Sequence, residues 1–273
     1  MSFITHITTH CDSEIIWYTS SLFEGAPHGF STRLGGVSGA PWDTLNLGTG
    51  RGDVHAHVVE NYRRFCSVIG ANPERVVLAK QVHETTVRVV TAADAGKGLY
   101  VSRDYTADAL ITVEPDLPLV VFSADCGILL LRDPVTGAVG AVHAGWRGCA
   151  AGIVEKAVVE LCKLSGAEAS RLCAAIGPCI GPRCFETDSD VPDAMRKALG
   201  RDAEHNFVYN YTRNKWQVDL AGLNREWLLR AGVPAAQIDT LRLCTSCHPE
   251  LFWSHRKMGD ERGAQVAMIM KAA

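Results

Sequence analysis

The sequence has 273 residues, of which 47% are hydrophobic and 21% charged, and its formal net charge is -3. This composition excludes a disordered chain, and the scattered Lys and Arg residues form no basic stripe for a nucleic acid polymer. The length is near the upper limit for one hydrophobic core, and no Pro-, Gly- or Ser-rich linker divides the chain, so one domain over residues 1–273 is expected.

The first feature is a segment at 28–48, HGFSTRLGGVSGAPWDTLNLG, whose many Gly, Ser and Asn residues predict an ordered loop. A helix is predicted at 54–69, because apolar residues recur at helical spacing between Asp53, a good N-cap, and Gly70. Short β-rich runs bounded by Pro, Gly and Asp then predict strands at 75–78, 86–90, 109–113, 119–122, 128–131 and 139–143.

In the second half, helical and extended patterns alternate. Apolar residues at three- and four-residue steps predict helices from about Gly148 to Leu164 and at 192–199 and 220–231. Strands are predicted at 172–176, 207–211, 238–243 and 265–270. These elements indicate a mixed α/β protein in which helices cover a sheet.

The N-terminus and the cysteines bear on the cellular compartment. Residues 1–21 have no cationic segment followed by an apolar run, and no stretch is long and apolar enough to span a bilayer. A cytoplasmic protein without a membrane partner is therefore expected. Ten cysteines would indicate a disulfide framework in a short secreted chain, but here most are expected to be free thiols.

Three candidate metal ligands end β-rich runs: His83 in AKQVHE, Cys126 in VVFSADCG and His143 in GAVHAGW. Residues at strand ends in an α/β protein can converge on one ion. Two imidazoles and one thiolate suit zinc, or copper, and leave an open fourth position, as in catalytic sites. For each residue taken alone, an ordinary interior side chain is the preferred interpretation.

Polar residues near these motifs are candidates for substrate contacts. In the loop at 28–48, Arg33 could hold an anion and Asn46 could read a polar edge of a substrate, although turn chemistry alone also explains the segment. Gly145 and Gly148 allow strained turn angles, and Arg147 with the following helix N-terminus could bind phosphate or carboxylate. A surface ion pair explains Arg147 equally well.

The sequence CTSCH, from Cys244 to His248, matches a haem-attachment pattern and half of a zinc ribbon. Haem attachment of that kind follows export, and no second CxxC pair completes four thiolates, so Cys244 and Cys247 are expected to bind neither haem nor a second metal. Cys179 and Cys184 lie in a Gly/Pro-rich turn that could approach this pair, and a structural role is preferred.

Several motifs occur together in order: HGFSTRLGGVSG, LNLG, QVH, DALIT, ADC, HAGWRG, IGPCIG and CTSCHPELFWSHRKMGDERG. This string, over about residues 28–270, resembles the YfiH/YlmD group of multicopper-polyphenol-oxidase-like, laccase-domain proteins. The resemblance implies a four-layer α/β/β/α fold and a zinc site at His83, Cys126 and His143. It also implies a purine nucleoside phosphorylase acting on adenosine, inosine and methylthioadenosine, with adenosine deaminase activity.

The leading hypothesis is a zinc-dependent enzyme whose partners are a purine nucleoside and phosphate, in a monomer or small homo-oligomer. Its candidate catalytic residues are Cys126, Asp125 as a proton shuttle, and Arg33; its candidate substrate-binding residues are Arg33, Asn46 and Arg147. One alternative is a cysteine hydrolase or amidase acting on cell-wall precursors, with Cys126 as the nucleophile. Another is a copper-dependent polyphenol oxidase, although the chain lacks the dense histidine pairs of a multicopper centre.

Overall fold

The computed structural model describes residues 2–10 and 13–273 and confirms the mixed α/β class. Its strands are β1 Phe3–His10, β2 Ser13–Ser20, β3 His28–Ser31, β4 Val77–Leu78, β5 Val87–Val89, β6 Ala109–Thr112, β7 Leu119–Ser123, β8 Gly127–Arg132, β9 Val139–Ala144, β10 Cys173–Ile176, β11 Glu186–Thr187, β12 Phe207–Asn210, β13 Lys215–Val218, β14 Ile238–Thr240 and β15 Gln265–Ile269. Its α-helices are α1 His55–Ile69, α2 Trp146–Ala150, α3 Ile153–Ser165, α4 Asp190–Leu199, α5 Leu220–Arg230 and α6 His255–Met258. Within the described ranges, no helix is long and apolar enough to cross a membrane.

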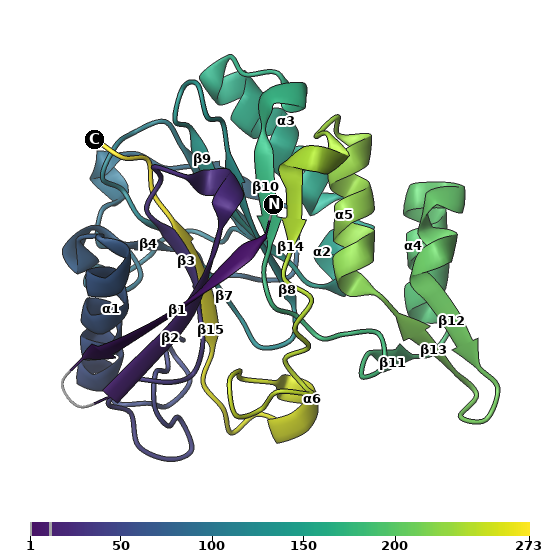
Figure 1. The fold of residues 1–273 in the computed structure, drawn as a ribbon, viewed down its shortest axis with the longest axis horizontal. Helices are drawn as coiled ribbons and strands as arrows, with labels where there is room; N and C mark the ends of the chain where they lie inside the picture. Colours follow the sequence, from purple (N-terminus) through teal and green to yellow (C-terminus); the bar gives the residue numbers. More distant parts are fainter. Residues whose placement is uncertain (1, 11–12) are drawn as a thin grey trace.

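Two six-stranded sheets form the centre of the molecule (Figure 1). The first has the order β1-β2-β3-β15-β7-β4, and the second has the order β14-β10-β8-β9-β6-β5. Helix α1 covers the outer face of the first sheet, and α3 and α5 cover the outer face of the second. The four-layer α/β/β/α arrangement implied by the resemblance is thus confirmed. A third, small sheet, β11-β13-β12, lies with α4 at one side of the molecule (Figure 1).

Both faces of the inner strands of each central sheet are buried, which explains why these strands read as continuous apolar runs. In β8, Leu130 points into the layer between the sheets, whereas Leu129 and Leu131 pack against the helices. In β15, Ala267 faces the second sheet while Val266 faces α1. Because side chains alternate along a strand, a run without polar residues can fill two cores at once.

The N-terminal part differs from the sequence prediction. Strands β1 and β2, which form an antiparallel hairpin, were not predicted, and β3 occupies the start of the segment expected to be a loop. β1 is an edge strand with exposed Ile4 and Ile7, so its sequence lacks the apolar run of a doubly covered strand. The loop after β3 is held from α1, where Asn61 donates hydrogen bonds to Ser38 and to the carbonyl of Asn46.

Helix α1 ends as predicted, because Gly70 has a φ of 76° and closes it with a left-handed cap. The prediction that Asp53 is its N-cap is wrong: Val54 takes that position without a side-chain cap. The Asp53 carboxylate instead accepts hydrogen bonds from Ser38 and Asn46, at 2.7 and 2.8 Å. Asp53 therefore stabilises the loop and is not the N-cap of the helix.

The single helix predicted from Gly148 to Leu164 is in fact two helices, α2 and α3. The chain breaks at Gly152, whose φ of 77° favours glycine. A Cβ at this position would also lie 3.3 Å from the ring of Trp227. Helix α2 consequently has five residues, too few to develop the full dipole of a longer helix.

The buried carboxylate of Asp133, which directly follows β8, forms an ion pair with Arg171 whose contribution to stability can be measured. Burial would raise the pKa of this carboxyl, but Arg171 and hydrogen bonds from Thr136 and Val135 hold the pKa well below its usual range. We expect Asp133→Asn to lower the free energy of unfolding by about 2 kcal/mol at pH 7, because it leaves the Arg171 guanidinium without its carboxylate. Urea denaturation measures the loss.

The pH dependence follows from the direction of this shift. A carboxyl with a lowered pKa in the folded state contributes its full stabilisation above the unfolded pKa of about 3.9 and loses it as the pH falls toward the folded pKa. The difference between Asp133→Asn and the parent protein should therefore shrink below about pH 4. Asp188→Asn, in an exposed pair with Lys215, is the control and should change stability little. An equal loss of unfolding free energy in both variants would contradict a specific stabilising role of the Asp133–Arg171 pair.

Candidate metal centre and active site

The three predicted ligands lie together. His83, Cys126 and His143 each offer a ligand atom, and these atoms lie within 4.8 Å of one another. His143 is buried, Cys126 is half-buried and His83 is exposed, so the group runs from the interior of the sheet to the surface. The predicted convergence is confirmed, and its exposed side leaves access for a further ligand.

The elements that carry these residues differ from the prediction. His143 lies within β9, and Cys126 lies in the turn between β7 and β8. Because Ile128 is paired with His143, the start of β8 brings Cys126 beside β9. The prediction that His83 ends a strand is wrong: it lies in the loop between β4 and β5, with a φ of 63°.

Asp108 holds two of the candidate ligands and was not singled out from the sequence. It is fully buried just before β6, which pairs with β9. One carboxylate oxygen lies 2.8 Å from Nδ1 of His143, which leaves the other ring nitrogen free to bind a metal. The same carboxylate accepts the backbone N–H of His83 and of both residues beside it, at 3.0 to 3.2 Å. Asp108 therefore fixes the ring of His143 and the position of the His83 loop.

The electrostatics of the group favour an ionised thiol. Burial alone would raise the pKa of Cys126, but the imidazoles of His143 and His83 lower it to about 6. Burial would lower the pKa of His143, but the Cys126 thiolate and Asp108 raise it to about 9. The thiolate is the form of a cysteine that binds metals, and His143 would have to give up its proton to act as a ligand. This donor set fits a soft transition metal.

Gly145 follows β9 and leaves room for the ligands. A Cβ at this position would lie 2.8 Å from Sγ of Cys126 and 3.1 Å from Nδ1 of His83. Its φ of -62° suits any residue, so the need for glycine is one of space and not of the strained angle expected from the sequence. We expect Gly145→Ala to fold normally yet lose activity on the order of 100-fold, because the methyl group displaces both ligands.

Chelator competition and steady-state rates measure this effect, and a melting curve checks the fold. Gly39→Ala is a matched control, because no atom lies within 4 Å of a Cβ at that exposed position. Unchanged metal affinity in Gly145→Ala would show that the ligands have more room than these distances indicate.

Asp125, the expected proton shuttle, braces the turn that carries Cys126. It has a φ of 90°, and its two carboxylate oxygens accept hydrogen bonds from Oγ1 of Thr245 at 2.6 Å and from the backbone N–H of Arg256 at 2.7 Å. Its own carbonyl accepts the N–H of Ile180 at 2.9 Å. These contacts show a positioning role, while proton transfer stays a prediction.

The side chains of Arg33 and Asn46 form hydrogen bonds with other residues of the protein. The Arg33 guanidinium donates to the carbonyl and carboxylate of Asp43 and to the carbonyl of Pro249, and it stacks 3.9 Å from the ring centre of Trp253. Asn46 is fully buried, and its amide bonds to Asp53 and to backbone groups. These contacts order the loop after β3, and a role for either residue in substrate binding stays a prediction.

Arg147 is exposed, and its guanidinium lies 4.4 Å from the ring centre of Trp146. The surface ion pair considered from the sequence is not formed with any described residue. Arg147 lies within α2, which has five residues and so little of a helix dipole, and the expected anion site at this helix stays a prediction. Arg147 remains available at the surface.

Arg262 is a second residue that sequence reasoning missed, although it lies in the GDERG motif. It is 6% exposed, and its Nε has no partner among the described residues. Burial and the charge of Arg51 lower its pKa to about 10, while Asp125 and Cys126 act in the opposite direction. A buried guanidinium near Cys126, with donors to spare, is suited to an anionic ligand.

Cys126 also lines a pocket with an aromatic wall. The residues around it are Ala124, Asp125, Cys126, Trp146, Ile180, Phe185, Leu220, His255 and Arg256. Trp146 is half-buried and Phe185 nearly fully buried, so flat apolar surface lies beside the three-ligand group. Pockets of this kind accept a planar ligand with a few polar atoms.

Cys184 lies beside the CxxC pair, with its Sγ 3.4 Å from Sγ of Cys247. Its approach, raised from the sequence, is confirmed. Cys184 thereby adds a third thiol to the pair of Cys244 and Cys247, which the spacing of the CxxC motif alone does not indicate.

Fold and site together define a class: a four-layer α/β/β/α protein with a candidate His–Cys–His metal centre beside an aromatic pocket. Residues 27–272 match the family model described as multi-copper polyphenol oxidoreductase laccase. The chain belongs to this family, and its resemblance to the YfiH/YlmD group is confirmed.

Named relatives are similar over most of their length. The purine nucleoside phosphorylase YlmD of Bacillus subtilis is 36% identical, with 90% of this chain and 88% of the relative covered. The adenosine deaminase RL5 of an unknown prokaryotic organism is 33% identical, with 89% and 93% covered. The crystal structure of YlmD from Geobacillus stearothermophilus superposes with a TM-score of 0.89 at 34% identity, with 99% and 100% covered. The prediction of an enzyme is thereby confirmed.

Proposed function

We propose that this chain is a zinc-dependent purine nucleoside phosphorylase that also deaminates adenosine. The observation that carries the proposal is the open group of His83, Cys126 and His143 beside the pocket of Trp146 and Phe185. The names of the relatives, purine nucleoside phosphorylase and adenosine deaminase, support both reactions. Adenosine, inosine and methylthioadenosine are the proposed substrates.

His83, Cys126 and His143 would hold the metal. Their thiolate and imidazole donors fit zinc, and copper remains the alternative because the same donors bind it. A bound zinc ion supplies a Lewis acid that polarises a coordinated oxygen. Asp108 keeps His143 in the orientation and tautomer required of a ligand, and metal analysis of the purified protein distinguishes the two ions.

The pocket would take the purine base. Base stacking on aromatic side chains contributes roughly 1–3 kcal/mol per base, and Trp146 and Phe185 offer such surfaces next to Cys126. Asp125 has one donor on each carboxylate oxygen, so each oxygen can still accept a proton. For deamination we therefore retain Asp125 as the proposed proton shuttle.

The phosphate would bind at Arg262. The Nε of its buried guanidinium has no hydrogen-bond partner among the described residues. The nearby positive charge of Arg51 disfavours the charged form of Arg262 as long as no anion lies between them. Phosphate between the two arginines would relieve this repulsion. Arg262 replaces Arg33 in this role, because the donors of Arg33 already bind Asp43 and Pro249, while Arg147 stays a surface candidate.

The test is chromatographic separation of the products from adenosine with and without phosphate. We expect adenine and ribose 1-phosphate only with phosphate, and inosine in both cases. Arg262→Gln should raise the KM for phosphate by about tenfold or more while inosine formation and metal content stay unchanged, because a charge-assisted contact contributes about 1.5–3 kcal/mol. Free ribose in place of ribose 1-phosphate, or an unchanged KM, would overturn this assignment.

A cysteine hydrolase acting on amide bonds, as in cell-wall precursors, is the second candidate. The observation in its favour is the chain of Cys126, His143 and Asp108, in which a lowered thiol pKa meets an imidazole held by a carboxylate. A thiolate bound to a metal is not free to attack a carbonyl. Amide cleavage that increases after chelation would therefore favour this reading, and activity lost on chelation would exclude it.

A further inference from the structure

A second group of sulfur ligands lies away from the His83–Cys126–His143 centre. Sγ atoms of Cys184, Cys244 and Cys247 lie within 4.8 Å of one another. Cys184 lies just before β11, whereas Cys244 and Cys247 follow β14, so two segments far apart in the sequence meet here. An isolated β-bridge between Cys179 and Cys244 holds them together.

The backbone supports negative charge on one of these sulfurs. The N–H of Gly181 donates a hydrogen bond to Sγ of Cys244 at 3.1 Å. A Cβ on Gly181 would lie 3.1 Å from Cβ of Cys244 and 3.4 Å from its sulfur, so glycine permits this close approach. A hydrogen bond to the ionised form of a group stabilises that form, and thiolate is the form that binds metals.

We propose that Cys184, Cys244 and Cys247 form a second metal site, which binds a thiophilic ion such as zinc or copper(I). Sulfurs bound to one tetrahedral ion at about 2.3 Å lie about 3.8 Å apart. In this cluster all three lie within 4.8 Å of one another, and those of Cys184 and Cys247 are 3.4 Å apart. A disulfide would join two sulfurs and leave the third unused. Three soft thiolates match the preference of zinc and copper(I).

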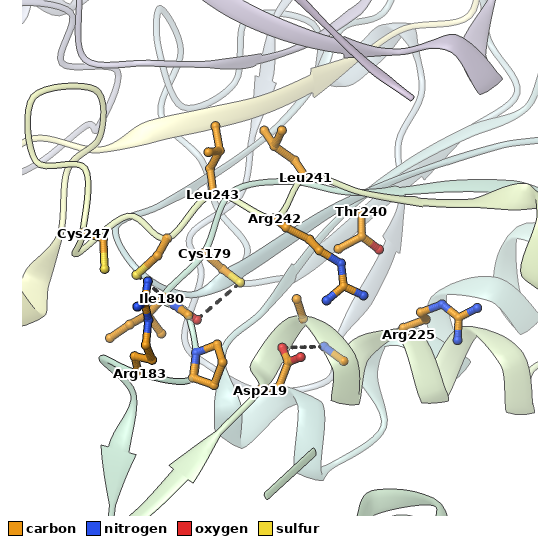
Figure 2. Close-up of a pocket in the computed structure, with 15 residues that line it drawn as sticks. Cys179, Ile180, Arg183, Asp219, Arg225, Thr240, Leu241, Arg242, Leu243 and Cys247 are labelled. Atoms are coloured by element: carbon orange, nitrogen blue, oxygen red, sulfur yellow. Dashed lines mark hydrogen bonds between the residues drawn. The ribbon is translucent and has the colours of Figure 1, made fainter. Parts of the chain in front are cut away.

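The surroundings of the cluster suit a bound ion. Cys244 and Cys247 line a pocket together with Arg183 and Arg242, and Figure 2 shows both arginines and Cys247 around this space. Three thiolates exceed the charge of a divalent ion by one, and positive side chains that line the same pocket would offset part of that excess. The pocket also leaves a fourth coordination position open to water.

The proposed site stabilises the turn of the first centre. Thr245, between the two cysteines of the pair, donates a hydrogen bond to Asp125 at 2.6 Å. Arg256 donates from its guanidinium to the carbonyl of Cys184 at 2.7 Å and from its backbone to Asp125 at 2.7 Å. An ion bound to the three thiols would fix both segments that brace Asp125, next to Cys126. The inference does not depend on the reaction catalysed.

The test is metal content per chain, measured by mass spectrometry after purification under reducing conditions with zinc in the medium. We expect about two equivalents in the parent protein and one in Cys247→Ser, whose side chain is exposed. Cys126→Ala should also retain one, and the double variant none. Cys162→Ser, on α3, is a matched control that should retain both equivalents.

Cobalt substitution provides a readout that does not require the cluster to be mutated. Cys126→Ala removes the thiolate of the first centre, so sulfur-to-cobalt charge-transfer absorption in this variant can come only from a second thiolate site. We expect this absorption in Cys126→Ala and its loss when Cys247→Ser is added. Its absence from a folded Cys126→Ala would overturn the proposal. Two thiols that become titratable only after dithiothreitol treatment would also overturn it and identify a disulfide.

Discussion

Cys126→Ala is expected to reduce both nucleoside phosphorolysis and adenosine deamination by roughly a thousandfold, since a metal ion contributes several kcal/mol to a transition state. The substitution removes the only thiolate of the first centre and leaves His83 and His143, which would bind the metal weakly. It also removes the negative charge that raises the pKa of His143. The effect is measured as the steady-state rate at saturating substrate and as the metal content of the purified variant.

The control for this variant is Cys162→Ala, which removes a half-buried thiol from α3 without touching the centre. It should retain the rate and the first-centre metal. A Cys126→Ala protein that keeps its full rate would refute the metal mechanism. A protein that loses nucleoside activity but keeps all its metal would instead assign Cys126 a direct chemical role.

Asp108→Asn is expected to weaken metal binding at the first centre by about 10–100-fold, the usual effect of removing a carboxylate that orients a histidine ligand. The amide keeps the size of the side chain but carries no charge, so it no longer favours the required orientation of His143. It also replaces the acceptor for the N–H groups around His83. Both ligands should therefore lose their positions together.

Chelator competition gives the metal affinity. Its pH dependence separates the effect of Asp108 on His143 from its effect on the His83 loop. The raised pKa of His143 depends in part on Asp108, so protons should compete less with metal in Asp108→Asn and the affinity should fall less steeply toward acid pH. Asp104→Asn, four residues away and exposed, is the control. Weaker binding with an unchanged pH profile would mean that Asp108 acts only by holding the His83 loop.

Much of the fold and the three candidate ligands followed from local features of the sequence. The apolar runs at β6 to β10 were recognised because both faces of the central sheets are buried, which leaves few polar residues in a strand. Gly70 marked the end of α1 because its left-handed conformation suits glycine. The chemistry of His83, Cys126 and His143 was evident from residue type, since two imidazoles and a thiolate form a soft donor set.

The partners of these residues were decided by tertiary structure alone. Asp108 meets His143 because β6 and β9 are paired, and Cys184 meets Cys247 because the segments before β11 and after β14 lie together. Arg33 and Asn46 were assigned to a substrate from the sequence, but in the fold their polar atoms bind neighbouring loops. Residue spacing reports contacts within a helix or along a strand, whereas strand order and loop approach depend on packing between distant segments.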